Sequence, residues 1–245
     1  MAEDNEALSA KALTLISHKL RTPLSIINGY SEAILSQAEK EKFSPFTTKA
    51  LEEINKQGNR MSMLIDKLMA FNQVAIADAS HLEKQPVELK NLIKECASKV
   101  IAQDEGAIPT KPSKGVKRGT FIEIDCSNQL KLLANAEMLR LAVQELLENA
   151  IKFNNKMEKI IRVQATNHGD SISISIRDYG VGIRPQDVSQ IFEPFYQVDD
   201  YFTGQVGGWG LGLPMVQRIL NLHNGSISVV SDRGLGSIFT LSFPL

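Results

Sequence analysis

The sequence predicts an α+β chain, with an N-terminal antiparallel helical hairpin followed by an α/β sandwich whose mixed, mostly antiparallel sheet is covered by helices on one face. Two observations lead to this prediction. Apolar residues recur in steps of three and four up to about residue 70 and alternate singly in short segments beyond about residue 90, which are the periods of helices and of half-buried strands. A small-residue stretch with Pro86 separates the two patterns. We therefore expect domains at 1–77 and 87–245, joined by a linker at 78–86.

The first pattern describes two helices separated by a turn at 43–46. Their apolar seams are Leu13, Ile16, Leu20, Pro23, Ile27, Tyr30 and Ile34, then Leu51, Ile54, Met61, Ile65 and Leu68. Two helices with fewer than about 70 residues cannot bury such seams alone. A second copy of the chain would cover them in a four-helix bundle. The sequence therefore predicts a homodimer formed through the hairpin.

Beyond the linker, single alternation predicts strands and longer periodic stretches predict helices. The predicted strands lie at 122–126, 172–176 and 239–243, and the predicted helices lie near 89–103, 136–154 and 213–223. Because each strand has one apolar face, we expect helices on a single side of the sheet. Residues 167–170 read Asn-His-Gly-Asp between two such strands, which predicts a hairpin turn.

Composition narrows the function. The 27 basic and 28 acidic residues leave a net charge of −1, so no overall positive field favours nucleic acid, and we expect no nucleic acid partner. Cys96 and Cys126 lie outside the Cys/His spacings of zinc sites, and we expect both thiols in the core. No stretch reaches the roughly 18 apolar residues of a membrane helix. We therefore expect a cytoplasmic chain without a membrane segment, and we leave open a membrane or sensory segment outside it.

Polar residues follow one face of the predicted helix at 136–154. Glu145, Asn149 and Lys152 are spaced by four and three beside an apolar stripe, so they form one row. Carboxylate and amide oxygens suit Mg²⁺, and the lysine suits a phosphate. The alternative reading is an ordinary exposed helix face.

Two glycine-rich segments follow. Asp178 ends a predicted strand, and Gly180 and Gly182 come directly after it, so a flat ring could lie against the backbone while the carboxylate accepts a hydrogen bond from an exocyclic amine. The alternative is a simple turn at a strand end. Farther along, glycines from Gly204 to Gly212 lead into a helix, whose free N–H groups favour phosphate; the alternative there is a flexible linker. The long segment between them, with Phe-Glu-Pro-Phe at 192–195, is typical of a lid or of disorder.

These segments resemble, in this order, the motifs of the GHKL ATP-binding domain. ELLENAIKF is similar to the N box, DYGVGI to the first glycine box, FEPF to the F box and GWGLGL to the second glycine box. With the preceding SHKLRTPL, the chain resembles the transmitter core of a two-component sensor histidine kinase. The resemblance implies a dimerisation and phosphoacceptor hairpin at 1–77, a Bergerat-type ATP-binding domain at 87–245, and the use of ATP and Mg²⁺.

The resemblance also assigns site residues. It implies nucleotide contacts from Glu145, Asn149, Lys152, Phe153, Asp178, Gly180, Gly182, Ile183, Phe195, Gly208, Gly210, Leu211, Gly212 and Leu213, with Glu145 and Asn149 also as metal ligands.

His18 falls two residues past the seam residue Ile16, so we expect it on the outer face of the bundle. The resemblance implies that His18 accepts the γ-phosphoryl group of ATP and passes it to an aspartate of a response-regulator receiver domain. Thr22 lies one helical turn beyond His18, where its hydroxyl could orient a water for dephosphorylation of that partner.

One position departs from the family pattern. Lys19 stands where the family usually carries an acidic residue directly after the phosphoacceptor. Two alternatives stay open beside the kinase, and Lys19 gives weight to the first of them. One is a pseudokinase, biased toward phosphatase activity or acting as a nucleotide-sensing scaffold. The other is a GHKL ATPase in which Glu145 activates water.

Overall fold

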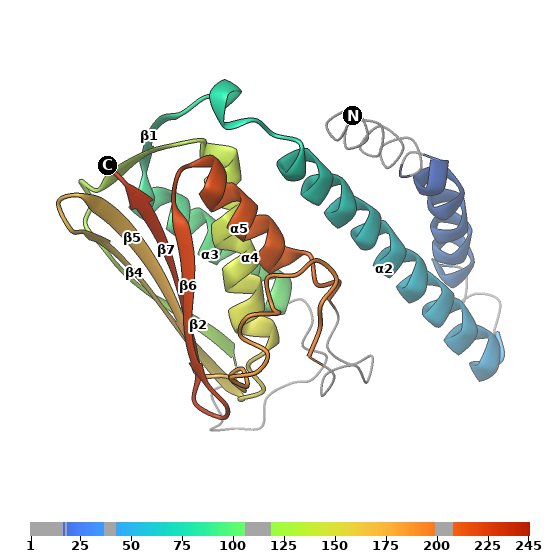
Figure 1. Cartoon of the computed structure of the whole chain (residues 1–245). Coiled ribbons are helices and arrows are strands. Elements are labelled where there is room, and N and C mark those ends of the chain that lie inside the picture. The colour runs from blue at the N-terminus through green and yellow to red at the C-terminus, as the bar shows by residue number, and fades with distance from the viewer. Residues whose placement is uncertain (1–16, 18, 37–42, 106–118, 199–207) are drawn as a thin grey trace. The chain divides into compact units, whose positions relative to one another are not determined.

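The structure is a computed structural model that describes residues 17, 19–36, 43–105, 119–198 and 208–245. It divides into two compact units, Met1–Ile76 and Ala77–Leu245. The predicted α+β class is confirmed, because the first unit is helical and the second combines a mixed sheet with helices (Figure 1). None of the described helices has both the length and the apolar character needed to cross a bilayer.

The first unit contains a helix over residues 19–36 and α2 (Pro45–Ala75). The Ser44 side chain caps α2 by accepting a hydrogen bond from the Thr47 N–H at 3.1 Å, and Pro45 occupies the first turn, as expected at a helix start. Polar side chains join the two helices, with Arg21 Nη2 2.7 Å from Asp66 Oδ1.

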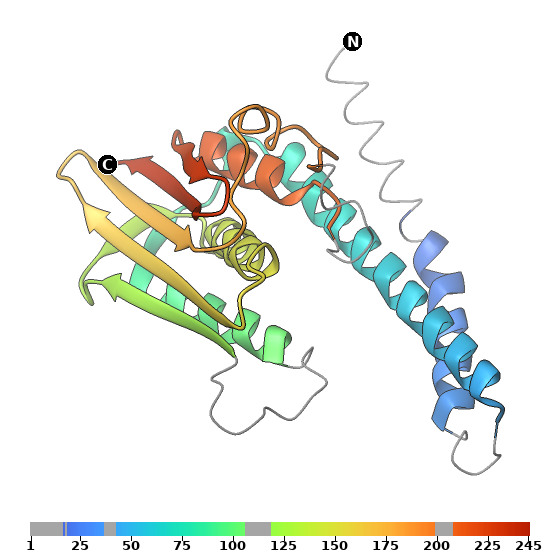
Figure 2. The same cartoon turned by 90° about the horizontal axis from the view of Figure 1, so that it is seen from below.

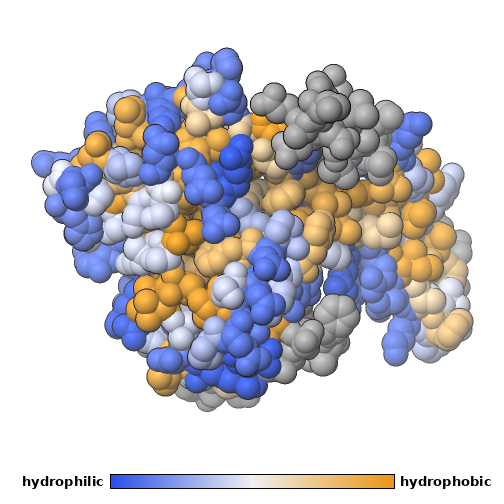
Figure 3. All heavy atoms as spheres, in the orientation of Figure 1, coloured by the Kyte–Doolittle hydropathy of each residue, from blue (hydrophilic) through white to orange (hydrophobic). Residues whose placement is uncertain are grey.

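Apolar side chains remain exposed along both helices of this unit, and Figure 3 shows hydrophobic surface over the hairpin. These residues are Leu20, Ile26, Ile27, Tyr30, Ile34, Ile54, Met61 and Met63. Most of them lie on the seams that the sequence predicted, so the hairpin as it stands leaves most of its described seam residues exposed, with Ile65 as a buried exception.

The second unit is a five-stranded sheet with three helices on one face (Figure 2). Its elements in chain order are η1 (Ala79–His81), β1 (Gln85–Glu88), α3 (Leu89–Glu105), β2 (Gly119–Cys126), β3 (Lys131–Ala134), α4 (Ala136–Lys152), β4 (Glu158–Asn167), β5 (Ser171–Asp178), α5 (Gly212–Leu222), β6 (Ser226–Asp232) and β7 (Gly236–Pro244). The strand order is β2-β4-β5-β7-β6, and only the β2–β4 pair is parallel. The mostly antiparallel sheet with one covered face is therefore confirmed.

Strand β5 shows how alternation builds the core. Ile172, Ile174 and Ile176 point toward the helices and are at most 1% exposed. Burying each such side chain stabilises the fold by roughly 1.5–3 kcal/mol. The same alternation places Asp178, the last residue of the strand, on the helix-covered face. The core therefore fixes the direction of this carboxylate.

A short two-stranded sheet begins at the end of the predicted linker. β1 pairs with β3 in antiparallel register, with Pro86 opposite Leu133. We read Pro86 as an interruption, but a proline is tolerated in a strand that has a free edge, because its missing N–H costs no ladder bond there. Residues 85 and 86, which were assigned to the linker, thus begin the second unit's strand β1.

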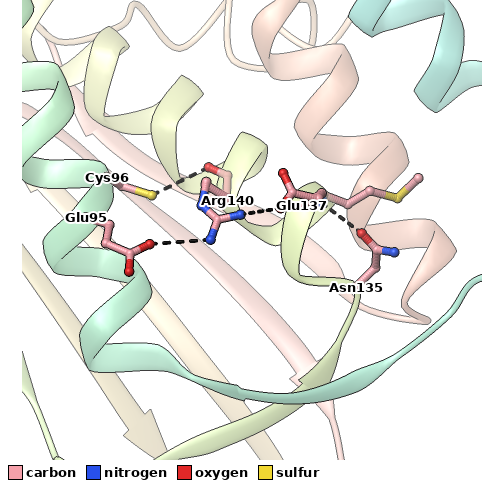
Figure 4. A network of polar contacts seen from close by, with 6 residues as sticks. Glu95, Cys96, Asn135, Glu137 and Arg140 are labelled. Carbon is pink, nitrogen blue, oxygen red and sulfur yellow. Dashed lines mark hydrogen bonds and ion pairs between the residues drawn. The ribbon is translucent and has the colours of Figure 1, made fainter.

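A polar network joins α3 to α4 (Figure 4). Arg140 Nη1 lies 2.7 Å from Glu137 Oε1, and Arg140 Nη2 lies 3.4 Å from Glu95 Oε2. The Cys96 thiol donates to the Arg140 carbonyl at 3.7 Å, and burial raises the pKa of this thiol to about 11. Both cysteines are free and buried, which confirms the prediction of core thiols.

His223 caps the C-terminal end of α5. A cation would suit this position, because positive charge is favoured at a helix C-terminus. Instead the ring is 5% exposed, its Nδ1 lies 2.8 Å from the Ile219 carbonyl, and its Nε2 accepts the backbone N–H of Asn135 at 3.0 Å. One ring nitrogen donates and the other accepts, so the ring is neutral. Burial lowers the pKa of His223.

The stability of the second unit should therefore depend on the His223 proton. The folded pKa lies below the ordinary 6.5, so the folded state binds fewer protons than the unfolded state. The stabilisation is complete above pH 6.5 and is lost as the pH falls from 6.5 through the lowered pKa. Thermal unfolding followed by circular dichroism should show a larger loss of Tm on acidification in the wild type than in His223→Gln. Equal losses of Tm in the wild type and in His223→Gln would contradict a role of the His223 proton. The matched control is His168→Gln, which changes a histidine of the exposed hairpin and should behave as the wild type.

Candidate functional site

The polar row predicted on α4 is partly buried. Asn135 caps the helix by accepting the Met138 N–H at 3.0 Å, and the row begins at Glu145, almost three turns later. Glu145 is 5% exposed, and Asn149 and Lys152 are half-buried. The alternative of an ordinary exposed helix face is therefore wrong for Glu145.

The second glycine segment lies directly against this row. A Cβ built on Gly212 would contact the Glu145 carboxylate and lie 3.9 Å from Asn149 Nδ2. A Cβ built on Gly208 would contact the Lys152 ammonium. The absence of side chains at these two glycines thus allows a backbone segment to approach a carboxylate and a cation of the same helix.

The N-terminus of α5 begins within this glycine segment. The helix starts at Gly212, and Leu211, the cap residue, makes no side-chain capping bond. Leu211 is fully buried and Pro214 lies in the first turn, while Leu213 is half-buried. The backbone N–H groups of this first turn lack intrahelical acceptors and favour an anion.

Asp178, at the end of β5, is 7% exposed. Its Oδ1 accepts the Gly180 N–H at 2.8 Å, and the carboxylate also accepts the Ser237 N–H. Burial raises the pKa of Asp178, while these two bonds and the nearby Lys156 oppose the rise. A buried carboxylate with hydrogen-bonding capacity left over can select a ligand that carries an amine.

The first glycine segment connects Asp178 to the end of α4. The Val181 N–H donates to the carbonyl of Phe153, the residue that caps α4, at 3.0 Å. A Cβ on Gly180 would collide with the same carbonyl, and Gly182 adopts φ +67° against the Asp232 carbonyl. The Ile183 N–H donates to Ser231 Oγ at 2.8 Å, so the segment is held from both sides.

Phe195 joins the F-box segment to the second glycine segment. Its N–H donates to the Gly210 carbonyl at 2.8 Å, and its φ of 67° is unusual for a residue with a side chain. Gly210 also has a positive φ of 65°. Lys152, the last residue of the polar row, also contacts its neighbour Phe153, because its Nζ lies 4.5 Å from the centroid of the Phe153 ring.

The other expected residues belong to the first unit or are outside the described residues. His18 is outside the described residues. Thr22 is exposed on the helix over residues 19–36, in the first unit. Gly204 and Gly207, from the predicted phosphate loop, are also outside the described part of the chain.

The sequence reasoning missed supporting residues from the β6–β7 hairpin. The backbone of Ser237 supports Asp178, and Ser231 holds Ile183. A serine in an alternating strand gives no signal of its own, because its role depends on which turn packs against it.

The residues present fit a magnesium ion bound together with phosphate. Among the described residues no group of three or more His, Cys, Asp or Glu could hold a metal. Mg²⁺ commonly takes only one or two protein ligands and fills its shell with phosphate oxygens and water. Glu145 and Asn149, one turn apart beside the α5 N-terminus, supply such a partial set of oxygens.

Two family models match the chain. The His Kinase A (phospho-acceptor) domain matches residues 10–75. The histidine kinase-, DNA gyrase B-, and HSP90-like ATPase matches residues 134–245. Together they include the hairpin and all the site elements from α4 onward.

Curated relatives carry the same two regions. The phosphate regulon sensor protein PhoR of Pseudomonas aeruginosa is 29% identical over 228 residues, which are 93% of this chain and 48% of that protein. The sensor-like histidine kinase SenX3 of Mycobacterium tuberculosis is 28% identical over 245 residues, which are 98% of this chain and 54% of that protein. The chain thus spans about half the length of these relatives. The crystal structure of full-length ShkA in complex with AMPPNP shares the fold, with a TM-score of 0.69, 24% identity, and coverage of 96% of this chain and 45% of that one.

The contact between Gly180 and α4 leads to a stability prediction. In Gly180→Ala the new methyl group must displace the Phe153 carbonyl and lies 3.0 Å from Asp178 Oδ1, so the variant should lose on the order of 2 kcal/mol of unfolding free energy. Gly29→Ala is the matched control, because a Cβ there meets nothing within 4 Å and alanine favours a helix by roughly 1 kcal/mol. Urea unfolding of the two variants checks the difference, and equal stabilities would contradict the close approach.

Proposed function

This chain belongs to the two-component sensor histidine kinases, of which it carries the phospho-acceptor and ATPase domains, and on that premise we propose that it is an ATP-dependent protein-histidine kinase. One observation supports the proposal most strongly. A carboxylate, an amide and a cation on α4 face the glycine-flanked N-terminus of α5, with the buried Asp178 in the same unit. This arrangement suits a purine triphosphate, because it offers an amine acceptor at one side and phosphate ligands at the other.

Each side chain has a proposed part in nucleotide binding. Asp178 accepts a hydrogen bond from the adenine amine, and the turn from Gly180 through Gly182 to Ile183 leaves room for the ring. The N-terminus of α5 and Lys152 bind the phosphates, since both present positive charge or N–H groups. Further contacts come from residues that border the site, namely Phe153, Phe195, Gly208, Gly210, Leu211, Gly212 and Leu213.

Glu145 and Asn149 would hold Mg²⁺, which would neutralise charge on the phosphates. The position of both side chains favours this role, because a Cβ on Gly212, the first residue of α5, would contact the Glu145 carboxylate and lie 3.9 Å from Asn149 Nδ2. The acid and the amide together keep the remaining coordination positions available to phosphate oxygens and water.

We propose that His18 is the nucleophile. A neutral imidazole nitrogen attacks the γ-phosphorus, the bond from that phosphorus to the β–γ bridging oxygen breaks, and ADP leaves with the bonding electrons. The phosphoryl group then passes to a carboxylate of a receiver domain on a response regulator. Thr22, exposed four residues beyond His18, would orient water when the chain dephosphorylates that partner.

The first unit favours a homodimer. Apolar side chains of both its helices are exposed, including Tyr30 at 70% and Ile27 at 49%. A second copy would bury them in a four-helix bundle. Such a bundle would display the phosphoacceptor of each copy on its outer face.

The kinase assignment is tested with Mg²⁺ and γ-labelled ATP. The wild type should acquire acid-labile, base-stable label, and His18→Gln should acquire none. Asn149→Asp should also lose label, because it removes the amide beside Glu145, yet it should keep the oligomeric state of the wild type. Release of free phosphate without label would support a GHKL ATPase, and nucleotide binding without either would support the pseudokinase; both outcomes would contradict the kinase.

The dimer is tested by light scattering coupled to size exclusion. Ile27→Lys should shift the chain toward the monomer mass, because each dimer would lose two buried aliphatic side chains, worth about 1.5–3 kcal/mol each, or together roughly 10²- to 10⁴-fold in the dissociation constant. The matched control is Leu133→Lys, which changes a residue of the second unit that is 61% exposed. If Ile27→Lys keeps the dimer mass, the interface lies elsewhere. The same conclusion follows if Leu133→Lys loses the dimer to the same extent as Ile27→Lys.

A further inference from the structure

A buried ionic cluster lies outside the residues assigned to nucleotide binding. Asp187 is 2% exposed, and its carboxylate accepts hydrogen bonds from Arg184 Nε at 2.6 Å and from the Tyr196 hydroxyl at 3.0 Å. A longer contact joins Arg184 Nη2 to the other oxygen, Oδ1, at 3.4 Å. We call Arg184, Asp187 and Tyr196 the clamp.

The clamp joins two ends of an irregular segment. Arg184 directly follows the first glycine turn, and Tyr196 directly follows the Phe-Glu-Pro-Phe motif at 192–195. A buried carboxylate is costly unless it is paired, and the bonds from Arg184 and Tyr196 hold the pKa of Asp187 below its usual value. The cluster therefore fixes the separation of these two ends at ordinary pH.

The neighbours of Tyr196 hold the second glycine segment. On one side the Phe195 N–H donates to the Gly210 carbonyl at 2.8 Å, and on the other Gln197 Nε2 donates to the Gly208 carbonyl at 3.1 Å. Phe195 has φ 67°, a conformation that costs a residue with a side chain roughly 1–3 kcal/mol unless its surroundings hold it. Fixing Tyr196 holds the backbone on which both bonds depend.

Gly208 in turn lies against Lys152. A Cβ on Gly208 would contact the Lys152 ammonium, so the position of the glycine backbone sets the space around this cation. Asp178, by contrast, is held by the N–H groups of Gly180 and Ser237. Through Tyr196 the clamp is thus connected to the phosphate side of the site, whereas none of the hydrogen bonds described for the Asp178 carboxylate comes from a clamp residue.

We propose that the clamp positions the phosphate-binding side of the nucleotide site, so that it tunes affinity for the triphosphate without touching the nucleotide. This inference rests on the proposed function. Arg184, Asp187 and Tyr196 are positioning residues, and losing one of their hydrogen bonds should weaken binding of ATP while leaving recognition of the nucleoside unchanged.

The test compares ATP with adenosine by calorimetry in the presence of Mg²⁺. Tyr196→Phe removes one hydroxyl and keeps the ring, so it should bind ATP about tenfold more weakly, the usual effect of losing one hydrogen bond to a charged group. Its affinity for adenosine should stay within about twofold of the wild type. In the labelling assay the KM for ATP should rise by a similar factor, with kcat within about twofold.

Asp187→Asn should give the same ATP-selective loss, and the double variant should lose less than the sum of the two, because both changes remove one interaction. Asp125→Asn is the matched control, since Asp125 is an exposed carboxylate that accepts from Gln164 at 3.0 Å on the sheet. Equal losses of affinity for ATP and for adenosine, or no loss of ATP affinity in Tyr196→Phe, would contradict the proposed role of the clamp. A wild type that binds no ATP would instead overturn the proposed function, so the two failures are distinguishable.

Discussion

The site depends on the close approach of two glycine segments to α4. Gly180 lies against the carbonyl that ends the helix, and Gly208 and Gly212 lie against its Lys152 and Glu145 side chains. A side chain at Gly180 would meet the Phe153 backbone and push the first glycine segment away from the helix, whereas a Cβ at Gly208 or Gly212 would displace the end of the Lys152 or Glu145 side chain. The missing Cβ atoms therefore allow one helix to share a site with a strand end and with the start of α5.

Burial of polar groups is the second constraint. Four polar side chains are at most 7% exposed, namely Glu145, Asp178, Asp187 and His223. The free-energy cost of burying each of them must be offset by hydrogen-bonding or charged partners. Asp178 and Asp187 are held by backbone N–H groups and by side chains respectively, and His223 is neutral between two backbone groups. The second unit thus keeps buried carboxylates paired with hydrogen-bond donors and keeps the buried histidine uncharged.

Periodicity made much of this arrangement predictable. The spacing of Glu145, Asn149 and Lys152 predicted one row, and alternation along β5 predicted the end of a strand at Asp178. The clamp was not predictable, because Arg184 and Tyr196 belong to a segment without a period and meet only through the fold. The neutral state of His223 likewise follows from tertiary burial, and the strand at Pro86 follows from a free sheet edge that no local pattern reveals.

We propose that Asp178, the α4 row and the α5 N-terminus form one adenine-nucleotide site. Titration calorimetry of the wild type with magnesium salts of ATP and GTP tests it most directly, because guanine presents a carbonyl where adenine presents the amine that Asp178 would accept from. We expect saturable binding of ATP and at least about tenfold weaker binding of GTP. Equal affinity for the two, or no heat with ATP on folded protein, would contradict the account.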